Sequence, residues 1–268
     1  MILENIHRLL NIVDIFKTLF SKFKNTSDYI KPVFWTFGKK YKIAAVHQYE
    51  VSDLDGSGYK PSPHPVQMTW KLEGAERAYE HFGPPFLLTT SSLYQKIRNI
   101  QLRILPDDVL LAIEVSKYDQ KVVLEALHNC IAHQDYTRNG RILVVEMLDR
   151  LIFENEGSFY EGQPNDYIAG NKTPRKYRNP FLVQAMTELN MIDTMGYGIY
   201  EMHLGQARRY FPLPDYDLSD NSSVKMTIYG SVVDPAYSRL LIQKTDLSWE
   251  DILLLDRVQK NYLYQMML

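Results

Sequence analysis

The clearest amphipathic pattern in the chain lies between residues 120 and 133. If this stretch is helical, Glu125, Asn129 and His133 recur every four residues and form one polar stripe. Asp119 stands directly before it and is a suitable N-cap. The pattern therefore predicts a helix over 120–133 with a polar side and a core side, and the apolar positions of the core side are Val123, Leu124, Leu127 and Ile131.

The residues of the polar stripe allow two interpretations. A solvated helix face is the first, and the E-x-x-x-N spacing of Glu125 and Asn129 is common in helices. Asn and His, however, each cost a helix roughly half a kcal/mol relative to Ala, so they are unusual choices for a solvated face. In the second interpretation Glu125 polarises a water molecule as a general base while Asn129 helps to hold a hydrated Mg²⁺ ion.

Shorter apolar runs predict the other elements of an α+β fold. A strand is expected over Gln67–Leu72 and a helix over Leu93–Asn99. Residues 141–146 and 151–153 are rich in β-branched residues and flank a short turn, which indicates a hairpin. Val224–Tyr229 predicts a further strand, so the strands and helices together indicate a mixed sheet.

Glycine-bearing turns follow the hairpin. Residues 157–177 lack apolar periodicity and predict a long loop of the kind that often covers a site, with a basic tail that ends at Arg178. Asn179 and Pro180 predict the start of a helix that ends near Asn190. Gly196-Tyr197-Gly198 then opens another helix, whose free amide groups suit a phosphate, although an ordinary helix-start turn explains the glycines equally well.

The two ends of the chain differ from its middle. Residues 1–60 are expected to form an N-terminal helical extension and linker, with a helix over Met1–Phe23 and an ordinary turn at the acidic loop 53–58. The central domain is expected over residues 61–235. Residues 236–268 predict a C-terminal helical segment that Ser248 caps.

Composition narrows the classes of function. Of the 268 residues, 45% are hydrophobic and 23% are charged, which is typical of a globular protein, and no run approaches the roughly 18 apolar residues of a membrane span. The net charge of −2 gives no general basic field for duplex DNA, although a local patch stays open. The single cysteine, Cys130, excludes an intrachain disulfide and suits the cytoplasm, and we expect it to be a buried thiol.

Three motifs, in this order, resemble one known family. Residues 125–136 read EALHNCIAHQDY, residues 178–181 read RNPF and residues 190–199 read NMIDTMGYGI. They resemble the RecG-like, divergent-AAA family of transcriptional regulators, which are often described as ATP-dependent DNA helicase-related proteins. The resemblance covers roughly residues 66–260. The order of elements is also similar to the Bergerat (GHKL-type) ATP-binding fold of gyrase, histidine kinases and MutL, which implies a mixed sheet with helices on one face, here with the N-terminal helical extension added.

The resemblance implies ATP and Mg²⁺ as cofactors and gives roles to individual residues. Glu125 matches the glutamate that activates the attacking water, and Asn129 matches the asparagine that binds magnesium. The remaining nucleotide contacts implied for this chain are His133 on the same helix, Asn155 and Gly157 at the base, Arg178 from the lid, and Gly196 and Gly198 at the phosphates.

The chain departs from the family pattern at the base-reading motif. Asn155 stands where an aspartate is expected, and Phe159 replaces the second glycine. An amide can still pair with an adenine edge, so two hypotheses remain. The first is an ATP- and Mg²⁺-binding regulatory module with at most a weak ATPase activity, and the second is a scaffold for homodimerisation or other protein contacts that has lost the nucleotide.

Partners and related activities follow from the same resemblance. Nothing in the sequence resembles the phosphate loop G-x-x-x-x-G-K-[ST] or the motor motifs of a helicase. Family members commonly carry an AlbA-type domain before this region and a winged helix after it. Residues 1–60 do not match the former and Leu268 precedes the latter, so we expect the chain to act on DNA only indirectly, through domains that are mostly missing here.

Overall fold

The computed structural model describes residues 67–83, 86–104 and 112–267. The predicted N-terminal helix over residues 1–23 and the acidic turn at residues 53–58 lie outside these residues. Among the described residues, no helix combines the length and the apolar character needed to cross a membrane.

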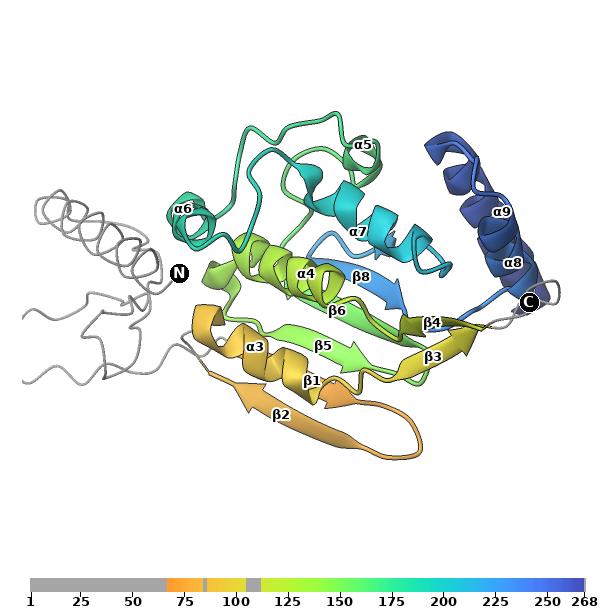
Figure 1. Cartoon of the computed structure of the whole chain (residues 1–268). Coiled ribbons are helices and arrows are strands. Elements are labelled where there is room, and N and C mark those ends of the chain that lie inside the picture. The colour runs from red at the N-terminus through yellow and green to blue at the C-terminus, as the bar shows by residue number, and fades with distance from the viewer. Residues whose placement is uncertain (1–66, 84–85, 105–111, 268) are drawn as a thin grey trace, which may run out of the picture.

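A six-stranded mixed sheet forms the centre of the described fold (Figure 1), with the strand order β2-β1-β5-β6-β8-β7. Strands β1 and β5 pair in parallel, and each other neighbouring pair is antiparallel. A separate antiparallel pair is formed by β3 and β4. The strands are β1 (Met68–Leu72), β2 (Ala78–Phe82), β3 (Gln101–Ile104), β4 (Ile113–Ser116), β5 (Ile142–Glu146), β6 (Arg150–Glu156), β7 (Asp215–Asp217) and β8 (Ser223–Tyr229).

Helices pack against this sheet and beside one another. In Figure 1, α3, α4 and α7 lie on the same side of the sheet, and α4 contacts β6 as well as the two other helices. The helices, apart from the short 3-10 turn Tyr136–Arg138, are α3 (Phe86–Lys96), α4 (Gln120–His133), α5 (Asn165–Ile168), α6 (Pro180–Glu188), α7 (Tyr197–Ala207), α8 (Pro235–Gln243) and α9 (Trp249–Met267). The α+β fold with a mixed sheet and helices is thereby confirmed.

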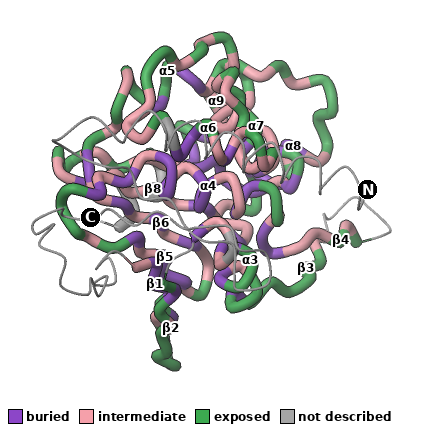
Figure 2. Tube along the Cα trace, turned by 90° about the vertical axis from the view of Figure 1, so that its left-hand side faces the viewer, coloured by how far each residue is buried: buried purple, intermediate pink, exposed green. Residues whose placement is uncertain are grey.

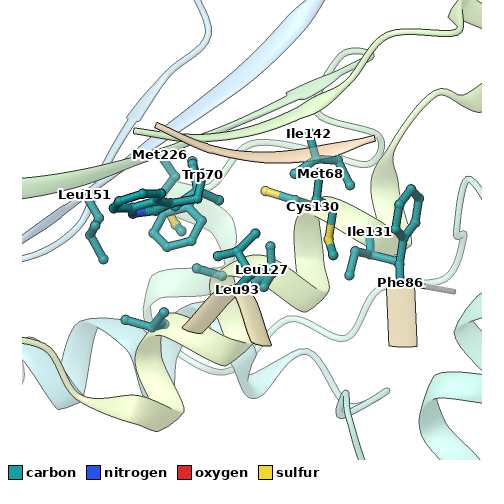
Figure 3. Close-up of a cluster of buried hydrophobic side chains, with 14 of the residues drawn as sticks. Met68, Trp70, Phe86, Leu93, Leu127, Cys130, Ile131, Ile142, Leu151 and Met226 are labelled. Carbon is teal, nitrogen blue, oxygen red and sulfur yellow. The ribbon is translucent and has the colours of Figure 1, made fainter. Parts of the chain in front are cut away.

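The hydrophobic core lies between α4 and the sheet (Figure 3). Leu127 and Ile131 of α4 are fully buried and belong to the same core cluster as Leu151 and Phe153 of β6. Burying a side chain of this size stabilises the fold by roughly 1.5–3 kcal/mol. The buried face of α4 is therefore the face that the apolar pattern predicted, and Asp119 caps the helix by accepting hydrogen bonds from the amides of residues 121 and 122.

Several predicted elements are confirmed, and others are wrong or were missed. The helix over Gln120–His133 and the hairpin of β5 and β6 are confirmed. The helix expected to begin at Leu93 begins instead at Phe86, and the lid loop contains the short helix α5. Strand β2 was missed because it is an edge strand with mostly exposed positions, so it shows no apolar alternation (Figure 2).

Candidate functional site

One cavity opens between α4, the sheet and the loop that follows β6. Its volume is about 120 Å³. Side chains from four separated parts of the chain line it. The residues that line it include Glu125, Asn129, His133, Phe153, Asn155, Phe159, Tyr160, Glu161, Tyr167, Lys176, Tyr177, Asp193, Gly196, Gly198, Tyr216, Val224 and Met226.

Helix α4 contributes the polar stripe to this cavity. Glu125, Asn129 and His133 all line it, because residues four apart share one side of a helix. The Nδ2 of Asn129 donates a 3.0 Å hydrogen bond to Oε1 of Glu125. This bond holds the carboxylate and the carboxamide side by side at the wall of the cavity, and all three side chains are partly buried.

Burial changes the acidity of Glu125. Desolvation raises its pKa from 4.5 to about 7, the hydrogen bond from Asn129 opposes this shift, and the nearby negative charge of Asp193 adds to it. A carboxyl group with this pKa is divided between its two protonation states at neutral pH. It can therefore accept a proton more readily than an ordinary glutamate, as a general base requires.

The glycine turn lies directly against this carboxylate. A Cβ atom on Gly198 would overlap the side chain of Glu125, so only glycine leaves the observed space to the carboxylate. Gly196 has a φ of 89°, which favours glycine, and a Cβ there would approach the Cδ of Pro174 in the lid to 2.7 Å. Both glycines are therefore sites of close approach, Gly198 to the movable side chain of Glu125 in α4 and Gly196 to the lid.

Asp193 holds the glycine turn in place. Its Oδ1 accepts a hydrogen bond of 3.1 Å from the amide of Met195, and its Oδ2 accepts one of 3.2 Å from the amide of Tyr197. Tyr197 is the first residue of α7, so the carboxylate satisfies an amide that the helix itself leaves unpaired. The sequence pattern D-x-x-G-x-G was the available signal for this role, which our sequence analysis did not use.

The floor of the cavity comes from β6 and β8. Alternate residues of a strand share one face, and Leu151, Phe153 and Asn155 are buried in this alternation. Asn155 is 5% exposed and pairs in register with Val224 of β8. Its Nδ2 donates a 3.1 Å hydrogen bond to the carbonyl of Glu156, and the cavity thus receives a carboxamide among apolar neighbours.

Aromatic side chains of the lid and of β7 form the opposite wall. The ring of Phe159 lies 6.1 Å from that of Tyr167 and 6.2 Å from that of Tyr216 between centroids. Tyr177 stacks on His133 at 6.2 Å. These rings line the cavity without closing it, and the four aromatic residues among positions 157–177 were the sequence signal for this wall.

Arg178 and Gly157 lie beside the cavity, outside its lining. The guanidinium of Arg178 donates a 2.8 Å hydrogen bond to the carbonyl of Ser158 and lies 3.7 Å from a carboxylate oxygen of Asp135. Gly157, with a φ of 100°, leaves the space that this guanidinium occupies. Among the described residues, Lys176 supplies the one lysine or arginine side chain in the lining of the cavity.

Burial also keeps His133 and Cys130 of the cavity neutral at neutral pH. Desolvation and the charge of Arg178 lower the pKa of His133 to about 4. Burial raises the pKa of the Cys130 thiol to about 12, so it is a buried thiol as predicted and not an activated nucleophile. The acidic side chains of the lining are Glu125, Glu161 and Asp193, and its basic side chain is that of Lys176.

Divalent metal binding by protein side chains alone is not supported in the described ranges. No group of three or more His, Cys, Asp or Glu side chains there is arranged to hold a metal ion. Glu125 and Asn129 nevertheless offer two adjacent oxygen ligands. Mg²⁺ commonly uses one or two such ligands and completes its shell with waters and phosphate oxygens, so the pair suits a metal that arrives with a phosphorylated ligand.

Comparison with solved structures supports the fold. The chain is similar to the DIP2311 protein from Corynebacterium diphtheriae, with a TM-score of 0.52 and 18% sequence identity over 64% of this chain. The similarity covers only 36% of that protein, so this chain spans a little over a third of it. None of the curated proteins compared matches the chain.

A family model matches part of the sequence itself. The matched residues are 132–228, and the model is described as "Putative ATP-dependent DNA helicase recG C-terminal". The match begins just after Asn129 and contains β5, β6, the lid, the glycine turn and most of β8. Residues 132–228 therefore match a RecG-like C-terminal, HATPase-type domain, in agreement with the resemblance that the sequence motifs carry.

Proposed function

We propose that this domain binds ATP together with Mg²⁺ and serves as the regulatory nucleotide module of a RecG-like transcriptional regulator that acts on DNA through other domains. One observation carries the proposal. The α4 stripe, Asn155, the glycine turn and the lid are far apart in sequence, yet they line a single cavity within a domain of the HATPase type.

Each part of the cavity suits one part of the nucleotide. Asn155 and the apolar floor would hold the base, since a carboxamide offers both a donor and an acceptor to an adenine edge. The amides around Gly196 and Gly198 would meet the phosphates at the start of α7, where the helix dipole favours negative charge. Lys176 lines the same cavity from the lid and would supply a positive charge for the anion.

Magnesium would join the phosphates to α4. Asn129 supplies an oxygen ligand, and Glu125 would remove a proton from water at the terminal phosphate. The cation is also needed electrostatically, since three carboxylates and one lysine line the cavity and would repel a bare triphosphate. We therefore expect tight binding of the magnesium complex and weak binding of free ATP.

Calorimetric titration tests this proposal. The purified chain is titrated with a non-hydrolysable ATP analogue in the presence of Mg²⁺, and separately in the presence of EDTA. Saturable binding should appear only with Mg²⁺, and Asn129→Ala should weaken it at least tenfold because it removes a metal ligand. Asn261→Ala is the matched control, since Asn261 is exposed on α9 and does not line the cavity.

The scaffold hypothesis makes the opposite prediction and has one observation in its favour. Phe159 packs against Tyr167 and Tyr216, so the lid rings occupy space next to the proposed base position. In a scaffold, these contacts would be permanent and the chain would use the domain for homodimerisation. The absence of any heat at millimolar ligand, with folded protein, would favour the scaffold and contradict nucleotide binding.

A further inference from the structure

The first turn of α9 contacts the lid. The Nε1 of Trp249 donates a 3.2 Å hydrogen bond to the carbonyl of Ile168, the last residue of α5. The indole ring also packs edge-on against Tyr200 of α7, with centroids 5.5 Å apart and planes at 74°. Figure 1 shows the corresponding arrangement, in which α9 stands beside α5 and α7. One side chain of the C-terminal helix thus touches both the lid and the helix that begins at the glycine turn.

The lid residue next to this contact belongs to the wall of the cavity. Tyr167 precedes Ile168, is 5% exposed and lines the cavity. Its hydroxyl donates a 3.0 Å hydrogen bond to the carbonyl of Glu161, and its ring packs on Phe159. A displacement of Ile168 would therefore move the aromatic wall, because adjacent residues of one helical turn cannot move independently.

Farther along, α9 is fixed to the edge of the sheet. Asp256 is 5% exposed, and its Oδ1 accepts a 2.9 Å hydrogen bond from the amide of Leu213. Lys260 donates to the carbonyl of Leu213 at 2.9 Å and forms a 2.7 Å ion pair with Asp215 in β7. Helix α9 is thus attached at one point to the segment that leads into β7 and at another point to the lid. It therefore has the geometry of a strap.

The lid is also attached to the body of the protein elsewhere, since α5 packs against α7 and Phe159 packs on Tyr216 of β7. Glu161 accepts hydrogen bonds from the amides of Arg175 and Lys176, and Lys172 pairs with Asp166, but these contacts join the lid to itself. The hydrogen bond from Trp249 differs from these contacts because it ties the last residue of α5 to the C-terminal helix α9. Tyr177, whose hydroxyl donates to the carbonyl of Thr194, holds the far end of the lid.

We infer that α9 is a strap that holds α5 over the cavity, and that Trp249 is the positioning residue through which it acts. Loosening the strap frees the aromatic wall and speeds the release of a bound nucleotide. This last consequence rests on the proposed function, whereas the mechanical coupling of α9 to the lid does not. Any movement of α9 is thereby transmitted to the nucleotide pocket.

Hydrogen exchange in the ligand-free protein tests the coupling directly. The readout is the set of amides in residues 163–170, among them those of Asp166, Tyr167 and Gly170, which donate hydrogen bonds within the lid. Trp249→Phe keeps an aromatic ring against Tyr200 but removes the N–H donor. We expect exchange of these amides to rise about fivefold, which corresponds to the loss of one ordinary hydrogen bond, with exchange in β5 and β6 unchanged.

Two matched variants serve as controls for Trp249→Phe. Leu254→Ala changes a side chain on the same helix that is 62% exposed, and Tyr200→Phe keeps the ring that Trp249 contacts, so neither should alter lid exchange. Unchanged exchange in Trp249→Phe would overturn the inference. A rise that extends equally over β5 and β6 would also overturn it, because Trp249 would then act on global stability.

The second experiment measures the release of Mg²⁺-ATP carrying a fluorescent label on the ribose, by stopped flow. Trp249→Phe should release the nucleotide about fivefold faster than the unsubstituted protein and than Leu254→Ala. Equal release rates together with faster lid exchange would overturn the link from lid to pocket. If no variant binds the nucleotide but the lid exchange responds to Trp249→Phe, the proposed function fails while the strap stands.

Discussion

Two buried glutamates at different places in the fold show how differently one side chain can be used. Glu146 ends β5 and has no exposed surface, and its carboxylate accepts hydrogen bonds from Nε1 of Trp70 at 2.9 Å and from Nε of Arg98 at 3.0 Å. Glu125 of α4 lines the cavity, is partly buried, and accepts one side-chain hydrogen bond among the described residues, from Asn129. Burial is thus common to both, whereas the supply of donors differs.

The difference teaches which buried acid to regard as functional. A carboxylate whose donors come from distant parts of the fold ties those parts together, and Glu146 does so for β1, β5 and the segment after α3. A carboxylate with too few donors beside an open cavity keeps capacity for a ligand or a proton, at a cost to the stability of the free protein. Glu125 is of the second kind, as its raised pKa also indicates.

The largest effect is expected from replacing Glu146, the carboxylate with the fuller set of hydrogen-bond donors. Glu146→Ala leaves the Trp70 N–H and the Arg98 guanidinium without their acceptor and should lower the free energy of unfolding by about 3 kcal/mol. Urea unfolding measures this loss. Glu80→Ala is the control, because Glu80 pairs with Lys96 on the surface and should matter by less than about 1 kcal/mol. Equal effects of the two substitutions would refute the comparison.

Replacing Glu125, the carboxylate with few hydrogen-bond donors, should stabilise the protein, but only at pH values above about 4.5. The folded pKa of Glu125 is about 7 and its unfolded value is 4.5, so the folded state holds the proton more tightly. Stability is then lost as pH rises from about 4.5 to about 7. Glu125→Gln mimics the neutral acid and should avoid that loss, with a gain of at most about 3 kcal/mol at pH 8 and little gain at pH 4.

The comparison between variant and parent isolates this effect. His133 and His203 have pKa values lowered to about 4, so each favours the folded state as pH rises from about 4 to 6.5, opposite in direction to Glu125. Both histidines are present in the parent and in Glu125→Gln, and their contributions cancel in the difference. If the gain in stability of Glu125→Gln is the same at pH 4 and at pH 8, the pKa of Glu125 is not raised in the folded protein.

Local patterns were sufficient to predict the elements near the cavity. The spacing of Glu125, Asn129 and His133 in one amphipathic helix, and the paired glycines before another, predicted structural features that the fold confirms. These features depend on helical periodicity and on turn chemistry, which act within a few residues. Their roles in binding a nucleotide stay predictions.

The features missed from the sequence depend on contacts between distant segments. The parallel pairing of β1 with β5 joins strands that are separated by β2, α3, the β3–β4 pair and α4, and no local pattern encodes it. Arg178, which was expected to meet the phosphates, contacts Asp135 and Ser158 at the side of the cavity, and its role toward a nucleotide stays a prediction. Which of several basic lid residues faces the pocket is decided by such partners and not by spacing.

A side chain at Gly198 should displace the carboxylate of Glu125 without removing its charge. Gly198→Ala places a Cβ where the carboxylate of Glu125 now lies, and the flexible glutamate can move aside. We expect the free energy of unfolding to change by less than about 1 kcal/mol, because alanine favours the helix that begins here. Binding of the Mg²⁺-nucleotide should weaken about tenfold, as a displaced general base and a narrowed phosphate turn predict. Calorimetry beside thermal unfolding distinguishes the two effects.

The smallest effect is expected at Asp193, whose charge acts on Glu125 from a distance. Asp193→Asn keeps one of the two acceptor oxygens, so it can accept from the amide of Met195 or from that of Tyr197 but not from both as the carboxylate does, and the glycine turn should persist with one hydrogen bond fewer. The negative charge that helps to raise the pKa of Glu125 is removed, and that pKa should fall while remaining above 4.5, because desolvation is the larger cause. The gain in stability from Glu125→Gln should therefore level off at a lower pH, and be smaller at pH 8, in the Asp193→Asn background. Since the substitution leaves the desolvation of Glu125 in place, a midpoint that does not move would mean that the solvent at the mouth of the cavity screens Asp193 from Glu125.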